Sequence, residues 1–224
     1  MQPKYEFTGE TEAWCGTTLK RIRAVRDIKA HGVPAGALGG WIESEMNLCQ
    51  GETDAWVSGE ARVYGGAWVG DNAMVSGCAR VNEHARICGN AKVYGGAWVS
   101  SHARVCGNAE VYGDAMVSEH ARVRDNAEVY GYSQVYGYSQ VYGDARVCGR
   151  AEVYGHADVS GAARIGGDAK VSVDARVYAA APDMLEALEK VADWLEGCST
   201  IETVREYVSA AFEQLQEEKK VRRS

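Results

Sequence analysis

The fold is decided by a stretch at residues 61–96, which reads ARVYGG AWVGDN AMVSGC ARVNEH ARICGN AKVYGG. The same six-residue pattern runs without insertion over residues 55–180, giving twenty-one consecutive hexads. The first position is Ala in every hexad except those that begin with Ser133 and Ser139, and the third position is always Val or Ile. An internal repeat this regular indicates a solenoid, in which each unit packs only on its neighbours.

The period of six selects strands over helices. An α-helix turns once in 3.6 residues, so a strict six-residue repeat cannot keep its small and aliphatic positions on one side. In a strand, the first and third positions point to the same side and the second and fourth point to the other. Gly at most fifth positions permits the positive φ that a tight corner needs. The pattern therefore predicts short strands joined by corners, with Ala and Val facing inward.

These hexads resemble those of the hexapeptide-repeat family, whose loose motif is [LIV]-G-x-x-A-x. The resemblance implies an all-β solenoid, a left-handed parallel β-helix with three sides and eighteen residues per coil. Residues 55–180 would then form about seven coils. The left-handed winding is implied by the family, since parallel crossovers in other folds are right-handed.

The repeat leaves a segment at each end. Residues 1–54 are expected to form an N-terminal β cap and a first irregular coil, because KYEFTGE and TLKRIRAV read as strands. The lead LKRIRAVRDI…GGWIE…NL resembles the start of enterobacterial and prophage hexapeptide proteins that are labelled putative transferases. Residues 181–224 are expected to form an α-helical hairpin, with Pro182 at a first helical position and a capping box from Ser199 to Glu202.

Composition narrows the class of protein. The net charge of −7 disfavours general nucleic-acid binding. The seven cysteines include no CxxC pair, and no secretory signal or membrane-length apolar run is present. We therefore expect a cytoplasmic protein with free thiols, no metal site and no membrane association. Cys88 and Cys106 would stack closely enough for a disulfide, but a reducing compartment favours a free pair.

Stacking at eighteen residues places several arginines in one outward column. Like charges about 4.8 Å apart repel one another. One interpretation is a solvated face neutralised by Glu83 and Glu119. The other is a stripe that binds phosphates or an acidic partner, because guanidinium groups suit such anions. The arginines concerned are Arg86, Arg104, Arg122 and, in the neighbouring column, Arg124.

Tyrosines form a second outward pattern. One column is a ladder of stacked rings that either packs the sheet together or provides a contact surface. The coil AEVYGYSQVYGYSQVYGD, at residues 127–144, adds a belt of rings that we interpret as a contact between copies of the chain or with another protein. The ladder is Tyr94, Tyr112 and Tyr130, and the belt contains Tyr130, Tyr136 and Tyr142.

A corner column carries His84, His102 and His120. Many hexapeptide-repeat relatives are trimeric acyltransferases, and that resemblance would make one of these histidines a general base acting with acyl-CoA. The uninterrupted coils offer no protruding acceptor loop, however, and three similar histidines favour a structural repeat. The sequence therefore favours a non-catalytic, self-associating dimer or trimer of phage or prophage type. We expect it to bind a host or phage protein or an anionic ligand, for example as an inhibitor of a host or defence factor, with an acyltransferase as the alternative.

Overall fold

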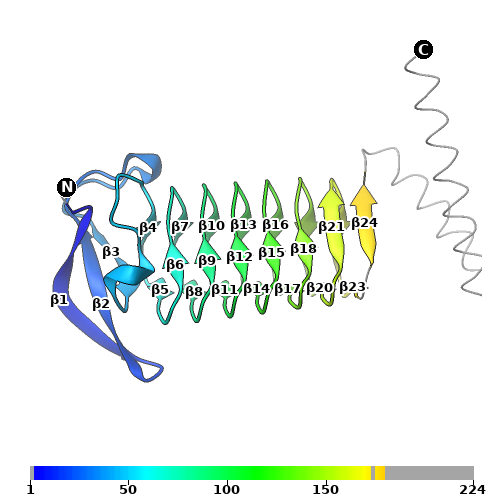
Figure 1. Ribbon diagram of the computed structural model, residues 1–224, viewed down its shortest axis with the longest axis horizontal. Coiled ribbons are helices and arrows are strands. Elements are labelled where there is room, and N and C mark those ends of the chain that lie inside the picture. Colours follow the sequence, from blue (N-terminus) through cyan, green and yellow to red (C-terminus); the bar gives the residue numbers. More distant parts are fainter. Residues whose placement is uncertain (1–2, 173–174, 180–224) are drawn as a thin grey trace, which may run out of the picture. The chain divides into compact units, whose positions relative to one another are not determined.

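The computed structural model describes residues 3–172 and 175–179 of the chain. They form a parallel β-solenoid whose coils stack along one axis, with an antiparallel cap at the N-terminal end (Figure 1). The expected all-β repeat fold is confirmed. The α-helical hairpin expected at 181–224 lies outside the described residues.

Each hexad contributes one short strand made by its second and third positions, and three strands complete a coil. The first face, here called the tyrosine face, contains seven parallel strands. Their bounds are β4 Trp56–Val57, β7 Met74–Val75, β10 Lys92–Val93, β13 Glu110–Val111, β16 Glu128–Val129, β19 Arg146–Val147 and β22 Arg164–Ile165.

The second face, here called the long face, continues the chain after the first corner of each coil. Its hexad strands are β5 Arg62–Val63, β8 Arg80–Val81, β11 Trp98–Val99, β14 Met116–Val117, β17 Gln134–Val135, β20 Glu152–Val153 and β23 Lys170–Val171. The third face, here called the arginine face, follows the next corner. Its strands are β6 Trp68–Val69, β9 Arg86–Ile87, β12 Arg104–Val105, β15 Arg122–Val123, β18 Gln140–Val141, β21 Asp158–Gly161 and β24 Arg176–Ala179.

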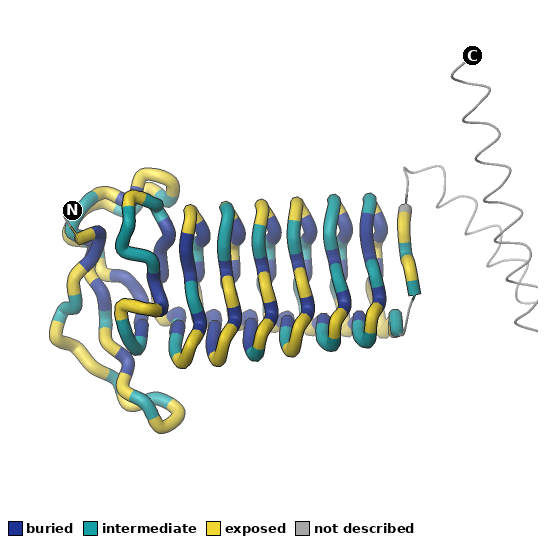
Figure 2. The backbone as a smooth tube through the Cα atoms, viewed as in Figure 1, coloured by how far each residue is buried: buried dark blue, intermediate teal, exposed yellow. Residues whose placement is uncertain are grey.

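The core consists of the first and third hexad positions, as the pattern predicts. From Ala55 to Val159 these side chains are almost fully buried, and Figure 2 shows buried positions alternating with exposed corners along the coils. The two serines at first positions are buried without loss of hydrogen bonding. Ser133 donates to the carbonyl of Tyr130 at 2.9 Å, and Ser139 donates to that of Tyr136 at 2.8 Å.

The corners adopt a left-handed backbone at the fifth hexad position. Gly107 is typical, with φ of 73°, and a Cβ there would lie 2.8 Å from the backbone nitrogen of Asp125 on the next coil. Glu83, Ser101 and Glu119 replace Gly at one corner yet keep φ near 59°. The backbone at this corner is therefore the same as at the glycine corners, and only the side chains differ. Non-glycine residues in this conformation cost on the order of 1 kcal/mol each.

A ladder of side-chain amides joins the coils at another corner. Asn72, Asn90, Asn108 and Asn126 each donate to the next side chain of the column at 3.0–3.3 Å, ending on Asp144. These exposed residues therefore satisfy one another along the axis of the solenoid, as their spacing in the sequence predicts.

The N-terminal cap covers the first coil with antiparallel strands. Strand β1 (Tyr5–Trp14) pairs with β2 (Thr17–Ala24), and β2 pairs with β3 (Leu38–Ile42). Strand β3 then pairs in parallel with β5, so it joins the long face as an eighth parallel strand. The irregular segment thus extends the seven expected coils to about eight turns. Two short 3-10 helices, η1 (Lys29–His31) and η2 (Glu45–Asn47), lie in this region.

The cap also buries a lysine. Lys4 is 0% exposed, and its Nζ has no hydrogen-bond partner among the described residues. Burial away from water lowers the pKa of Lys4 from 10.5 to about 8. An ionised amine in this position lowers the stability of the folded state, which makes Lys4 a measurable probe of the cap.

Candidate anion-binding face

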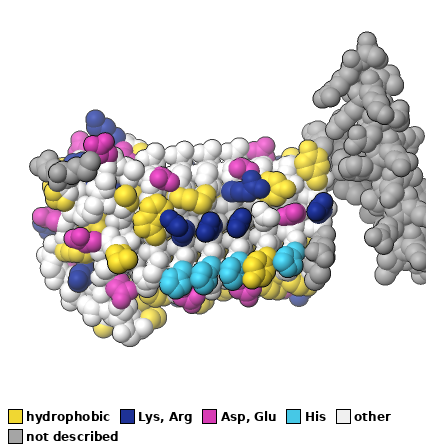
Figure 3. Space-filling view, viewed as in Figure 1, with side chains coloured by type: hydrophobic (Ala, Val, Ile, Leu, Met, Phe, Trp, Pro, Cys, Tyr) yellow, Lys and Arg dark blue, Asp and Glu magenta, His cyan; other side chains and the backbone are white. Residues whose placement is uncertain are grey.

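The three arginines that the sequence places in one column do lie in register. Arg104 on β12 pairs with Arg86 on β9 and with Arg122 on β15. All three side chains are exposed. Figure 3 shows a row of basic side chains running along the solenoid beside a row of histidines. We call Arg86, Arg104 and Arg122 the arginine ladder.

The arginine ladder has no ion-pair partner among the described residues. Neither Glu83 nor Glu119 forms an ion pair with it, so the interpretation of a locally neutralised face gains no support. On the other two faces, three cations instead meet a carboxylate on an adjacent coil, although Arg80 and Arg164 form no ion pair among the described residues. These pairs are Lys92–Glu110 at 2.9 Å, Arg146–Glu128 at 3.1 Å and Lys170–Glu152 at 3.0 Å.

Aromatic rings contact Arg86, at one end of the ladder, and Arg124, in the neighbouring column. The guanidinium of Arg86 lies 5.0 Å from the ring centre of Trp68, one coil earlier. Arg124, also proposed from the sequence as a binding residue, is already engaged by the ring of Tyr142 at 4.1 Å and the carboxylate of Asp125 at 3.3 Å. The role of Trp68 was missed, although its position eighteen residues before Arg86 is the signal that places it there.

The histidine column lies at the corner that leads into the arginine face. The ring centres of His84 and His102 are 5.1 Å apart, as are those of His102 and His120. The stack continues through Tyr138 to His156, with separations of 4.7 and 5.2 Å. Among the described residues, no hydrogen bond joins a histidine of this column to a carboxylate, so no group orients a general base there. The described part of the chain also holds no cluster of three or more residues suited to a metal ion.

A disulfide borders the arginine ladder. Cys88 and Cys106 occupy the outward fourth positions next to Arg86 and Arg104, and they are bonded to each other. The expectation of a free pair was therefore wrong. In-register pairing on parallel strands holds the two Cα atoms 4.6 Å apart, within the range that a disulfide requires. The repeat places the two cysteines close enough for a disulfide, but the expectation of a free pair gave more weight to a reducing compartment.

The tyrosine ladder lies on a different face from the arginine ladder. Tyr94 and Tyr112 stack with ring centres 4.9 Å apart, as do Tyr112 and Tyr130. The hydroxyl of Tyr94 donates to Glu110 at 3.0 Å, and that of Tyr112 donates to Glu128 at 3.2 Å. Burial together with the carboxylate of Glu128 raises the pKa of Tyr112 to about 12. The hydroxyl groups of Tyr94 and Tyr112 are therefore already hydrogen-bonded within the protein, which favours packing between coils as the role of the ladder.

The tyrosines of residues 127–144, which include the belt, differ in how far they are exposed. Tyr136 and Tyr142 are half-buried, Tyr136 lies on the long face, and Tyr142 contacts Arg124 on the arginine face. The corner tyrosines are the accessible ones, with Tyr132 65% exposed and Tyr138 57% exposed. The rings of Tyr130, Tyr136 and Tyr142 therefore lie on three different faces, and the belt does not form a single contact surface.

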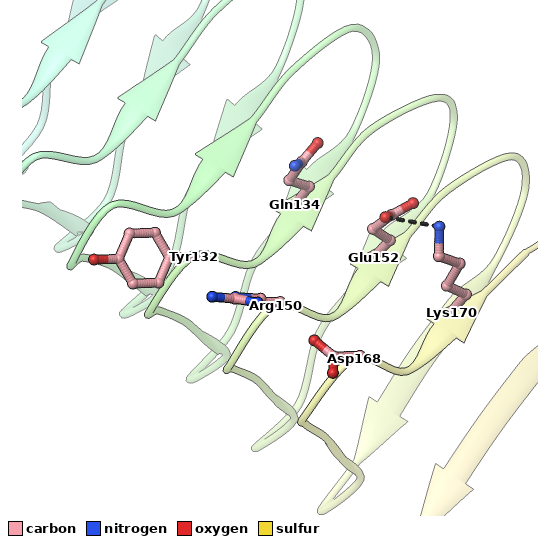
Figure 4. Close-up of a pocket in the computed structure, with 6 residues that line it drawn as sticks. All are labelled: Tyr132, Gln134, Arg150, Glu152, Asp168 and Lys170. Carbon is pink, nitrogen blue, oxygen red and sulfur yellow. Dashed lines mark ion pairs between the residues drawn. The ribbon is translucent and has the colours of Figure 1, made fainter.

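A shallow depression of about 390 Å³ lies beside Tyr132, between the tyrosine face and the long face. Figure 4 shows Glu152 paired to Lys170, and Arg150 extending toward Tyr132. The carboxylates of Glu152 and Asp168 line the depression beside its two cations, which leaves it less suited to an anion than the arginine ladder. Its lining residues are Tyr132, Gln134, Arg150, Glu152, Asp168 and Lys170.

Comparison with known proteins adds one similarity. Residues 85–101 match the family described as YdcK Beta solenoid repeat. This stretch contains Cys88 and strand β9, which begins with Arg86. The match supports a β-solenoid repeat and covers a small part of the chain. No curated protein matches the chain. Within the described residues, no helix has the length and apolar character needed to cross a membrane.

Proposed function

We propose that this protein is a non-catalytic binding protein that recognises an anionic group, on a small ligand or on a partner protein, through the arginine ladder. One observation supports this proposal above the others. Arg86, Arg104 and Arg122 are three consecutive exposed arginines in register, without an ion-pair partner among the described residues, whereas several cations of the other faces pair with a carboxylate on an adjacent coil.

Ligand binding would relieve an unfavourable arrangement. Three guanidinium groups about 4.8 Å apart repel one another until an anion lies between them. Each guanidinium presents a planar fork of donors that matches a carboxylate or phosphate. The rigid sheet holds the backbones of the three arginines in register before binding, so association orders side chains but no backbone segment.

The alternative proposal is a trimeric acyltransferase that uses acyl-CoA, with His84, His102 or His120 as general base. It is favoured by the exposed histidine column beside a cationic face, since acyl-CoA carries phosphates. It is disfavoured by the missing carboxylate partner, because a general base normally needs a group that orients it. Both proposals use the same face, so one set of variants can separate them.

Several finer features belong to the same proposal. We propose left-handed winding of the coils, on the resemblance of the hexads to the hexapeptide-repeat family. We also propose a cytoplasmic protein of phage or prophage type that self-associates as a dimer or trimer and acts on a host or defence factor. The exposed corner rings of Tyr132 and Tyr138 are candidates for contacts between copies. Sedimentation of the wild type and of Tyr132→Ser/Tyr138→Ser would test self-association directly.

The binding proposal is tested with inorganic pyrophosphate and fluorescein-labelled polyglutamate as probes. Binding is measured by calorimetry and by fluorescence anisotropy at 20 mM and 200 mM salt, using the wild type and Arg86→Gln/Arg104→Gln/Arg122→Gln. The matched control is Lys92→Gln/Arg146→Gln/Arg164→Gln, which removes three cations from the tyrosine face. We expect the ladder variant to lose binding and the control variant to keep it. Equal loss in both variants would show a response to net charge alone and would refute the proposal.

The acyltransferase alternative has its own readout. If acyl-CoA protects the wild type against thermal unfolding and His102→Ala abolishes thioester cleavage in the presence of acceptors, the protein is an enzyme. Protection that depends on the arginine ladder without any thioester cleavage would instead identify acyl-CoA as an anionic ligand.

A further inference from the structure

We infer that the arginine ladder fits an acidic α-helix of a partner protein, laid along the axis of the solenoid with its carboxylates facing Arg86, Arg104 and Arg122. This inference rests on the proposed function and specifies the partner. It follows from three properties of the arginine face, which are its spacing, its borders and its surrounding charge.

The spacing of the ladder matches one face of a helix. Adjacent coils lie about 4.8 Å apart, so the three arginines span about 9.6 Å between the first and the third. An α-helix rises 1.5 Å per residue, so carboxylates at positions i, i+4 and i+7 span about 10.5 Å, in steps of about 6.0 and 4.5 Å. Arginine side chains are long enough to absorb the remaining difference of about 1 Å. An acidic helix can therefore offer one carboxylate to each guanidinium.

An extended peptide fits the ladder less well. Side chains on one side of a strand repeat every two residues, or about 6.7 Å, so three carboxylates span about 13 Å. The mismatch over two steps is then about 4 Å, and the outer contacts would be stretched. The spacing of the arginines thus favours a helical partner over a strand that presents alternate acidic residues.

The borders of the ladder leave room for a helix. On one side, the disulfide of Cys88 and Cys106 presents short side chains beside Arg86 and Arg104, and Arg124 follows in that column beside Arg122. On the other side lies the histidine column, whose exposed rings at His84, His102 and His120 add hydrogen-bonding groups along the same axis. Charged groups on a helix about 10 Å wide could thus contact both the guanidinium and the imidazole rows.

The charge around the ladder favours a short acidic segment over a nucleic acid. The whole chain carries a net charge of −7, so a long polyanion would be repelled by the surface beyond the ladder. The ladder itself extends over only three coils, because Gln140 and Asp158 occupy the next two positions of the column. A helix with three carboxylates matches this length, whereas a nucleic acid would extend past it.

The test uses two labelled peptides of identical composition on an alanine-rich helical background. The first carries Glu at i, i+4 and i+7, which lie on one face, and the second carries Glu at i, i+2 and i+5, which do not. Circular dichroism confirms equal helicity, and anisotropy measures binding to the full chain at 20 mM salt. We expect the first peptide to bind at least tenfold more tightly, with the preference lost in Arg104→Gln and kept in Arg164→Gln.

The outcomes separate this inference from the proposed function. Equal binding of both peptides, with loss in Arg104→Gln, would refute the helical partner and leave anion binding intact. Failure of both peptides and of pyrophosphate would refute both. Tighter binding of a single-stranded oligothymidylate than of the first peptide would also overturn the inference, because it would identify a nucleic acid as the better partner.

Discussion

Replacing the central arginine of the ladder is expected to stabilise the protein. Arg104 has Arg86 and Arg122 as its neighbours in register, one coil away on either side. Two unit charges about 5 Å apart in water repel by about 0.8 kcal/mol, and flexible side chains reduce this by moving apart. With two neighbours, Arg104→Gln should raise the free energy of unfolding by ~1 kcal/mol at low salt. Gln suits the position, since Gln134 and Gln140 occupy the same hexad position elsewhere.

The assay is urea denaturation followed by circular dichroism at 20 mM and 1 M sodium chloride. At 1 M salt the screening length falls to about 3 Å, so the gain should nearly vanish. Lys92→Gln is the matched control, because Lys92 has Glu110 as its neighbour at 2.9 Å. It removes the same charge but breaks an attraction, so a loss of up to about 0.5 kcal/mol is expected at low salt.

The signs of the two changes in unfolding free energy show whether the arginine ladder is under electrostatic repulsion. Opposite changes that both shrink with salt would support a ladder under electrostatic repulsion. If Arg104→Gln destabilises the protein by the same amount at both salt concentrations, the aliphatic part of Arg104 contributes packing that outweighs repulsion. The argument that an anion relieves the ladder would then fail.

Substitutions at Lys4, at two corner glycines and at Asn108 test other parts of the structure. Lys4→Met should stabilise the protein at pH 7 by up to about 3 kcal/mol, from a pKa lowered from 10.5 to about 8. The unfolded state binds more protons between these values, so the advantage should shrink as pH rises from 8 toward 10, and a pH-independent difference would contradict it. Gly107→Ala should lower the free energy of unfolding more than Gly167→Ala, because both glycines have positive φ but, within the described residues, only a Cβ at Gly107 meets backbone of the next coil, at 2.8 Å; equal midpoints in urea would be the contrary result. Asn108→Ala removes two amide hydrogen bonds of 3.0 Å and should lower the unfolding free energy by ~1 kcal/mol, whereas an unchanged thermal midpoint would show that water replaces them.

The repeat made the three faces predictable. A period of six with no insertion places residues eighteen apart on adjacent coils, so the columns of Arg, Tyr, His and Asn follow from counting alone. The stacking of Tyr94 on Tyr112 and the amide ladder from Asn72 required no information beyond this register. Backbone hydrogen bonds between coils fix the register, and the side chains have little choice of neighbour.

Features that depend on contacts outside the repeat were less predictable. The pairing of β3 with β5 and the burial of Lys4 arise in the irregular N-terminal segment, where no period relates one residue to the next. Within the repeat, the register places Trp68 beside Arg86, but the contact of the guanidinium with the ring depends on side-chain rotamers. The disulfide of Cys88 and Cys106 was predictable from its geometry, but the inference from the cellular compartment pointed the other way.

The uninterrupted register of the coils makes the length of this molecule adjustable in discrete steps. Because every coil contains eighteen residues in equivalent positions, deleting residues 97–114 would join two corners of the same kind and bring Arg86 next to Arg122. The solenoid would shorten by about 4.8 Å, and the core of the remaining coils would be unchanged. Duplication or loss of one coil would thus change the length of a recognition surface by one coil at a time.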